Sequence, residues 1–356
     1  MTSREGSSGK KRSNKTPIIA GAVAGVISRF CIAPLDVVKI RLQLQPQLLA
    51  STVGYHGGSG TVALAGGGAG AAMGTVYRGI YGTMRTIVRE EGVTALWKGN
   101  IPAELLYLTY GAAQFYAYSQ CQQMLSASPY SSNLPTGLIN TFSGGLAGGM
   151  ATSITYPFDL LRTRFAASKA KGRDGRVYKG LAGAIREIYV NEGIKGFYRG
   201  GFAAVVQIVP YMGLFFGSYE GIKTTLKQIP PPDFAFVDEK HRSLVENLVG
   251  RGSIDAISGI LASVTAKTGV FPLDTIRKRL QVQGPTRGHY VHGDIPVYEG
   301  VIKCGVDIVK REGWRGLYRG LTVSLVKAAP ASAVTMWTYG RMVEALTWVE
   351  GTADGA

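Results

Sequence analysis

One short motif occurs three times in this chain, and this repetition limits the fold more than any other feature of the sequence. Each copy reads proline, apolar residue, aspartate, two further residues, a base, any residue and arginine, at residues 34–41, 157–164 and 272–279. A second motif follows each copy and joins Glu-Gly to an aromatic residue, a base and glycine, at residues 91–99, 192–200 and 312–320. Two linked motifs in a constant order indicate three tandem copies of one structural unit.

Each unit also carries two apolar segments. The first segments are residues 18–33, 138–156 and 254–271, and the second are residues 101–118, 202–219 and 321–339. A length near ~20 residues suits a helix that crosses a bilayer. The proline that ends each first segment would break a soluble helix, but a packed membrane bundle tolerates it as a kink. The pattern predicts an all-α membrane protein with six spans; the alternative is a soluble protein with six core helices.

The basic residues are distributed unevenly, and this predicts an orientation in the membrane. The formal net charge is +16, and 25 of the 39 Lys and Arg residues lie in the loops at residues 39–99, 162–200 and 277–320. The connections between units have no charge at residues 120–137 and balanced charge at residues 220–252. Such an asymmetry orients multi-pass proteins with the basic loops inside. Both termini are therefore expected on the less basic side.

Together the motifs resemble those of the mitochondrial carrier family of inner-membrane solute carriers. The resemblance implies a pseudo-threefold bundle of three two-helix repeats, with six transmembrane helices around a central substrate site and short amphipathic helices in the matrix loops. It places the repeats at residues 17–126, 136–229 and 250–350, and omits a basic tail at 1–16 and a Gly/Ala-rich insertion at 46–76. It also implies a monomer without cofactor, in the mitochondrial inner membrane, with its termini towards the intermembrane space.

The first motif places an acid and a base three residues apart, and such residues share one helix face. By resemblance, each acid pairs with the base of another repeat to close the matrix side, as Asp36–Arg162, Asp159–Arg277 and Asp274–Lys39. Exposed pairs contribute only ~0–1 kcal/mol each, so that such a gate can open. Gln43 and Gln281 are expected to brace two of the pairs, whereas Ala166 stands at the third position. A less complete cytoplasmic gate is expected at Tyr219, Glu220 and Lys223.

The positions that line the cavity in the family predict the residues that contact substrate. Five residues before the prolines stand Arg29, Thr152 and Lys267, and seven after the glycines of the second motif stand Leu106, Gln207 and Lys327. Three cations within apolar spans suit a diphosphate or polyphosphate. Glu104, with Tyr107 near it on the same helix, is expected to bind a cationic or aminated ring. The alternative for Glu104 is an internal salt bridge. The alternative for Lys267 and Lys327 is that their side chains reach towards the membrane interface.

Residues 97–115 resemble the branch of the family that carries thiamine pyrophosphate, which combines a diphosphate with a thiazolium and an aminopyrimidine. The resemblance therefore implies thiamine pyrophosphate as substrate, and another phosphorylated solute (adenine nucleotide, deoxynucleotide or coenzyme A) as the alternative. The amino ends of the loop helices near Gly82, Gly183 and Gly305 are further expected to suit an anionic lipid headgroup.

Other function classes are disfavoured. The four histidines all fall in loops, and no catalytic triad order or cofactor fingerprint is present, so an enzyme is not expected. Three distant cysteines, Cys31, Cys121 and Cys304, predict neither a disulfide framework nor a metal site. The glycine run at residues 66–70 lacks the Gly-Lys-Ser/Thr of a phosphate-binding loop. A nucleic-acid-binding protein is disfavoured because no recognition motif accompanies the positive charge.

Overall fold

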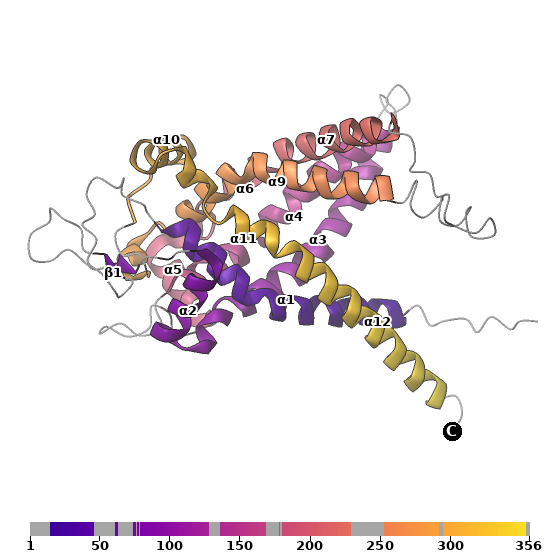
Figure 1. The fold of residues 1–356 in the computed structure, drawn as a ribbon, viewed down its shortest axis with the longest axis horizontal. Coiled ribbons are helices and arrows are strands. Elements are labelled where there is room, and N and C mark those ends of the chain that lie inside the picture. The colour runs from indigo at the N-terminus through magenta and orange to yellow at the C-terminus, as the bar shows by residue number, and fades with distance from the viewer. Residues whose placement is uncertain are drawn as a thin grey trace, which may run out of the picture.

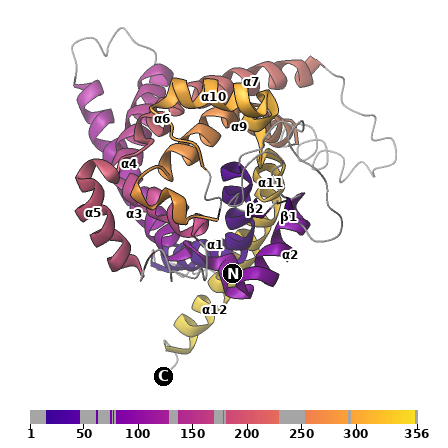
Figure 2. The same cartoon turned by 90° about the vertical axis from the view of Figure 1, so that its left-hand side faces the viewer.

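The structure is a computed structural model that describes residues 15–45, 61–62, 74–75, 77, 79–127, 136–168, 178, 180–228, 253–291 and 295–353. Long helices run around a central axis, and shorter helices gather at one end (Figures 1 and 2). Most of the N-terminal tail and of the Gly/Ala-rich insertion lies outside the described residues. Within the insertion, β1 (Thr61–Val62) pairs antiparallel with β2 (Gly74–Thr75), Thr61 opposite Thr75. The all-α architecture predicted from the repeats is confirmed.

The described ranges contain six helical rods, two in each repeat. Four rods are single helices: α1 (Lys15–Leu44), α3 (Asn100–Ser126), α4 (Thr136–Ala167) and α9 (Ser253–Gln281). The other two are broken into α6 (Gly201–Val206) with α7 (Ile208–Gln228), and α11 (Leu321–Val326) with α12 (Ala328–Ala353). The ring closes because α3 packs along α4, α7 along α9, and α12 back along α1. The start of α1 and the end of α12 lie at the same end of the bundle (Figure 1).

The two broken rods are interrupted close to a proline. The breaks fall at Gln207 and Lys327, three residues before Pro210 and Pro330. Proline has no amide hydrogen, so the helix loses one backbone hydrogen bond at that turn. In the first repeat Thr109 occupies the equivalent position, and α3 continues unbroken.

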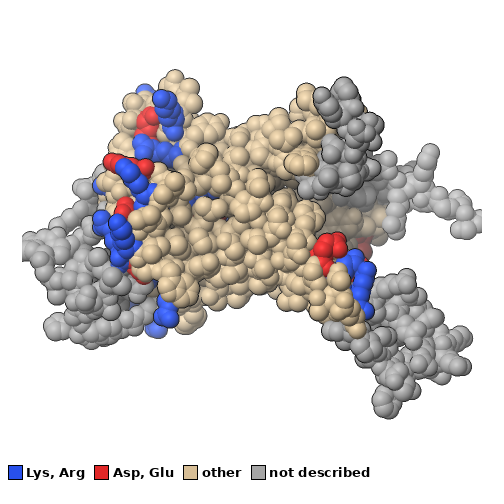
Figure 3. All heavy atoms as spheres, turned by 90° about the horizontal axis from the view of Figure 1, so that it is seen from above, with Lys and Arg blue, Asp and Glu red and all other residues tan. Residues whose placement is uncertain are grey.

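The middle of the bundle presents an uncharged surface. In the face seen in Figure 3, charged side chains cluster at the two ends and a band without Lys, Arg, Asp or Glu separates them. Among the described residues, three segments are long and apolar enough to cross a membrane, Ile19–Leu44, Gly201–Gln228 and Ile254–Gln281. In the other three rods, α3 has 27 residues, α4 has 32 and α12 alone has 26, and each length is also sufficient for a span.

The prolines that follow the first apolar segments lie inside helices, as the expectation of a tolerated kink allows. Helices α1, α4 and α9 continue through Pro34, Pro157 and Pro272 for a further ten, ten and nine residues. Proline removes one backbone hydrogen bond in each case. The turns beyond it carry the charged residues of the motif, and their bonds to neighbouring helices hold these turns in place.

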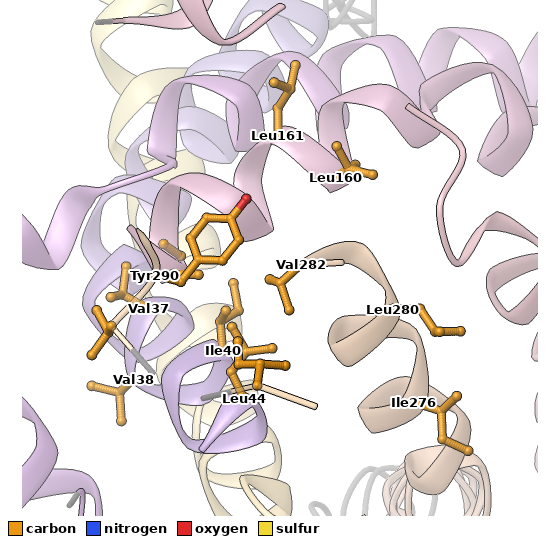
Figure 4. Close-up of a cluster of buried hydrophobic side chains, with 14 of the residues drawn as sticks. Val37, Val38, Ile40, Leu44, Leu160, Leu161, Ile276, Leu280, Val282 and Tyr290 are labelled. Carbon is orange, nitrogen blue, oxygen red and sulfur yellow. The ribbon is translucent and has the colours of Figure 1, made fainter. Parts of the chain in front are cut away.

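An apolar core lies at the end where the shorter helices gather. Figure 4 shows side chains from α1, α4 and α9 gathered there, among them Val37, Leu160 and Ile276. The shorter helices of this end are α2 (Gly79–Glu91), α5 (Leu181–Gly196) and α10 (Val301–Glu312), with the short turns η2 (Val93–Trp97), η5 (Pro285–His289) and η6 (Trp314–Tyr318). They occupy the loops predicted to hold amphipathic helices.

The three cysteines are free thiols. Cys31 is exposed, whereas Cys121 and Cys304 are buried. Burial in α10 raises the pKa of the Cys304 thiol to about 12. Cys304 is therefore a protonated packing residue at neutral pH.

Candidate functional site

A ring of ion pairs joins α1, α4 and α9 just beyond the prolines. The structure brings together all three predicted pairs: Asp36 with Arg162 at 2.5 Å, Asp159 with Arg277 at 2.8 Å, and Asp274 with Lys39 at 2.6 Å. We call each pair a corner of the ring and name it by its acid. The side chains are 8–17% exposed, so the pairs are largely buried. The value of ~0–1 kcal/mol expected for exposed pairs therefore does not apply, because removing one partner of a buried pair costs about 3–5 kcal/mol.

Glutamines contact two of the corners, as the sequence predicted. Gln43 donates from Nε2 to Asp274 at 3.3 Å. Gln281 donates from Nε2 to Asp159 and to the hydroxyl of Tyr156, the latter at 3.1 Å. Its Oε1 accepts a hydrogen bond from Thr163 at 2.7 Å. The amide of Gln281 thereby joins α9 to α4 around the ion pair.

Sequence reasoning missed a second cation at the Asp159 corner. Lys278 lies 3.0 Å from Asp159 and also donates to Thr163 at 2.9 Å. The basic triplet at residues 277–279 is the signal that could have indicated it, because only the third repeat has three consecutive bases here. The Asp159 corner is consequently the most heavily bonded of the three.

A second set of ion pairs, which we call the outer pairs, attaches the shorter helices to the bundle. Arg41 pairs with Glu91, Arg164 with Glu192 and Arg279 with Glu312. Each arginine also donates from Nε to a backbone carbonyl of another repeat, of Ala166, Gln281 and Gln43 respectively. Burial alone would raise the pKa of Glu91, but hydrogen bonds from Arg41 and Lys98 lower it below its ordinary value. These pairs were also missed, although the final arginine of the first motif and the glutamate of the second recur in every repeat.

Two of the predicted substrate residues, Arg29 and Tyr107, meet in a pocket above the ring. The guanidinium of Arg29 lies over the Tyr107 ring, and the Tyr107 hydroxyl accepts a hydrogen bond from Arg162 at 3.2 Å. Asp36 and Arg162 also line this pocket. The Asp36 corner therefore adjoins two of the predicted substrate residues.

Glu104 lies on α3 one turn before Tyr107. Its Oε1 is buried without a hydrogen-bond partner, and the described residues form no salt bridge to it. The internal salt bridge considered for Glu104 is therefore absent from this part of the chain. Gln207 likewise has a buried Oε1 without a partner. An unpaired buried acceptor costs about 1–3 kcal/mol unless a donor reaches it.

The remaining predicted substrate residues differ in their surroundings. Lys327 donates to Asp36 at 2.6 Å and so points to the ring, not to a membrane interface. Lys267 makes no ion pair or hydrogen bond within the described ranges, although its charge acts on Lys39 and Asp274. Thr152 is partly buried on α4. These three do not line the pocket that contains Arg29 and Tyr107.

The predicted cytoplasmic gate residues lie at the opposite end of the bundle. Lys223 pairs with Asp255 at the start of α9, at 2.7 Å, and the Tyr219 hydroxyl donates to the same carboxylate at 3.3 Å. Glu220 is exposed and forms no ion pair with any described residue. Sequence reasoning missed Asp255, although an acid in the first turn of an apolar span was a visible signal. Among the described residues, this end carries the partly exposed interhelical pair of Lys223 and Asp255, and the other end carries a buried ring.

Comparison with known proteins agrees with this arrangement. A family model described as "Mitochondrial carrier protein" matches residues 10–129, 135–229 and 252–349. The chain belongs to the mitochondrial carrier family. This carrier is 52% identical over 329 residues to "Mitochondrial thiamine pyrophosphate carrier 1" of Phaeosphaeria nodorum, with 92% of each chain covered. Proteins of the same name from Aspergillus oryzae and Coccidioides immitis are 52% and 51% identical, over 95% and 92% of each chain.

Family membership makes this carrier a transporter of the mitochondrial inner membrane. The end that bears α2, α5 and α10 is closed in this structure by the ring of ion pairs and by the apolar core beneath it. Two of the predicted substrate residues, Arg29 and Tyr107, share a pocket with Asp36 and Arg162 of the ring. The described residues thus offer clustered cations and one acid, Glu104, for which they provide no ion pair. They also offer the ion pairs of the ring, which a charged ligand can disturb.

Proposed function

We propose that this carrier imports thiamine pyrophosphate into mitochondria by alternating access through one central site. The observation that carries the proposal is its 50–52% identity, over at least 90% of its length, to fungal proteins that bear this name. The side chains of the candidate site agree with such a ligand, because they combine cations with an acid that has no ion pair. Adenine nucleotides, deoxynucleotides and coenzyme A are the alternative substrates.

The diphosphate is assigned to Arg29, Lys267 and Lys327. Arginine offers a planar fork of donors and lysine a compact charge, and both bind phosphate oxygens through charge-assisted hydrogen bonds. Glu104 and Gln207 are assigned to the ring end of the substrate. Their unpaired buried oxygens would accept hydrogen bonds from the aminopyrimidine, and the carboxylate would attract the thiazolium cation. Thr152 and Tyr107 complete the proposed site.

In the proposed cycle the ring forms the matrix gate and Tyr219, Glu220 and Lys223 contribute to the cytoplasmic gate. The structure then corresponds to the state that is closed towards the matrix. Substrate shifts the equilibrium only by as much as it binds the two states differently. Its charge–charge contacts with the cations must therefore offset the loss of the buried pairs.

The orientation of the carrier in the membrane follows from the assignment of the ring to the matrix gate. The start of α1 and the end of α12 lie at the end opposite the ring, and we place this end towards the intermembrane space because the basic loops are expected inside. The amino ends of α2, α5 and α10, at Gly79, Leu181 and Val301, remain candidate sites for anionic lipid headgroups.

Substitution of Glu104 tests the ring assignment. Glu104→Gln keeps the size of the side chain and removes its charge, so thiamine pyrophosphate should lose affinity while inorganic pyrophosphate does not. Competition by both compounds against thiamine pyrophosphate uptake in proteoliposomes measures this difference. We expect a loss of about tenfold for thiamine pyrophosphate, the size of one charge-assisted contact.

Lys267→Gln is the complementary variant, and it should weaken both compounds. Equal losses for both compounds in Glu104→Gln would contradict the ring assignment. The wild-type carrier is screened by thermal unfolding with thiamine pyrophosphate, ATP and coenzyme A, because a ligand at 100 times its Kd stabilises the folded state by about 2.7 kcal/mol. Stabilisation by ATP or coenzyme A but not by thiamine pyrophosphate would contradict the proposed substrate.

A further inference from the structure

The three corners of the ring are built differently. Asp159 is held by Arg277, by Lys278 and by Gln281. The Asp274 corner is held by Lys39 and Gln43. The Asp36 corner has no glutamine, because the position four residues after its arginine is an alanine.

At the Asp36 corner the support comes from the substrate site. Lys327 on the third repeat donates to Asp36 at 2.6 Å, beside Arg162 at 2.5 Å on the other carboxylate oxygen. Arg162 in turn donates to the Tyr107 hydroxyl at 3.2 Å, and Arg29 lies over the ring of that tyrosine. Both halves of this ion pair are therefore held by side chains assigned to substrate.

The other two corners lack such a connection within the described ranges. Lys267 is the candidate substrate residue whose charge acts on the Asp274 corner, yet no hydrogen bond or ion pair joins it to Asp274 or Lys39. The contacts of the Asp159 corner come from Arg277, Lys278 and Gln281 on α9, none of which is assigned to substrate. Within the described ranges, the Asp36 corner is thus the one that candidate substrate residues contact through hydrogen bonds and ion pairs.

Competition for Lys327 provides the physical link. A diphosphate carries more negative charge than one carboxylate and offers more acceptor oxygens, so it competes with Asp36 for the same ammonium group. If Arg29 also turns to the diphosphate, it leaves the Tyr107 ring. Asp36 and Arg162 then keep each other but lose the support on both sides.

We infer that the Asp36 corner is the place where substrate opens the matrix gate. Lys327 and Tyr107 act as positioning residues, because they support the ion pair of Asp36 and Arg162 when the site is empty and release it when substrate binds. The diphosphate draws Lys327 from Asp36, this corner separates first, and the glutamine-braced corners follow. The inference rests on the proposed function in one respect, since it requires an anionic substrate at the central site.

A double-mutant cycle tests the link between Lys327 and Asp36. The variants are Lys327→Gln, Asp36→Asn and the two combined, and thermal unfolding is followed without ligand and with thiamine pyrophosphate, ATP or coenzyme A. Without ligand the two effects should deviate from additivity by about 2 °C or more. With a ligand that stabilises the wild type, this deviation should shrink to within error.

The outcomes separate this inference from the proposed function. Additive effects without ligand, or a deviation that persists with a stabilising ligand, would overturn the inference alone. Stabilisation by ATP or coenzyme A but not by thiamine pyrophosphate, with the deviation lost, would overturn the proposed substrate alone. Absence of stabilisation by any of the three compounds would contradict both.

Transport rates provide a second test that does not depend on removing a buried charge. Ala166→Gln supplies the missing brace at the Asp36 corner, and we expect the maximal uptake rate to fall about threefold to tenfold with little change in KM. Gln43→Ala changes the brace at a corner that opens later, and we expect it to alter the maximal rate less than Ala166→Gln does. Tyr107→Phe keeps the ring but removes the hydroxyl bonded to Arg162, and should raise the maximal rate.

An unchanged rate in Ala166→Gln, or a larger effect of Gln43→Ala, would overturn the inference. If Ala166→Gln does not fold, Tyr107→Phe decides the question. A rate in Tyr107→Phe that equals that of the wild type would then count against the Asp36 corner as the first to open.

Discussion

At the scale of single residues, the glycines that end the second motif explain how neighbouring repeats approach one another. Gly99, Gly200 and Gly320 all have left-handed backbone angles, with φ of 83°, 77° and 84°. A side chain on Gly99 would place its Cβ 2.6 Å from the carbonyl oxygen of Arg162, the base of the Asp36 corner. The glycine is thus required by conformation and by contact together.

We expect Gly99→Ala to lower the stability of the carrier by about 2 kcal/mol or more, because alanine disfavours this conformation and the new Cβ must displace backbone. Thermal unfolding of the purified protein measures the loss. Gly21→Ala is the control, since no heavy atom lies within 4 Å of its added Cβ. Equal losses in both variants would show that the close approach at Gly99 is not the cause.

At the scale of elements, the shorter helices are attached to the bundle by buried charge as well as by apolar contact. Arg164 is fully buried in α4 and forms two hydrogen bonds with Glu192 of α5, at 2.6 and 3.0 Å. It also donates to the Gln281 carbonyl at the end of α9. One side chain therefore fixes α5, α4 and α9 relative to one another.

Glu192→Gln should destabilise the carrier by about 3 kcal/mol, since it leaves a buried guanidinium without its counter-charge. Chemical or thermal unfolding in detergent measures this change. Glu299→Gln removes one partner of an exposed pair with Lys303 and serves as the control, with little expected effect. A comparable loss of stability in the two variants would contradict the structural role of the outer pairs.

At the scale of the whole molecule, the two ends of the bundle are closed to different degrees. The end with the shorter helices has the buried ring, the outer pairs and the apolar core. At the opposite end, Lys223 and Asp255 form a partly exposed pair between α7 and α9. In this conformation the buried ion pairs and the apolar core that join the described helices lie mainly at the end with the shorter helices.

Asp159→Asn should consequently be the most damaging substitution among the three ring acids, because it leaves Arg277 and Lys278 buried without a full counter-charge. We expect a loss of about 3–5 kcal/mol, or failure to fold, with smaller losses for Asp36→Asn and Asp274→Asn. Asp255→Asn at the open end should leave the unfolding temperature nearly unchanged. A larger effect at Asp255 than at Asp159 would contradict the assignment of the closed end.

The sequence by itself determined the architecture. Motif repetition predicted three units, apolar length predicted six rods, and the three-residue spacing of each acid and base predicted that the two share a helix face. These inferences succeed because each depends on local spacing along a helix, which the chain carries in its order of residues. The pairing of charges between repeats and the two bracing glutamines were implied by the resemblance to the mitochondrial carrier family.

Only the tertiary structure decided which charges share a partner. Lys327 and Tyr107 were assigned to substrate, yet in the folded chain they also hold Asp36 and Arg162, from another repeat in each case. Lys278 and Asp255 joined ion pairs that no motif indicated. Spacing within one helix fixes the face on which a residue lies, but the partner on that face depends on how separate helices cross, and this is set by packing of the whole bundle.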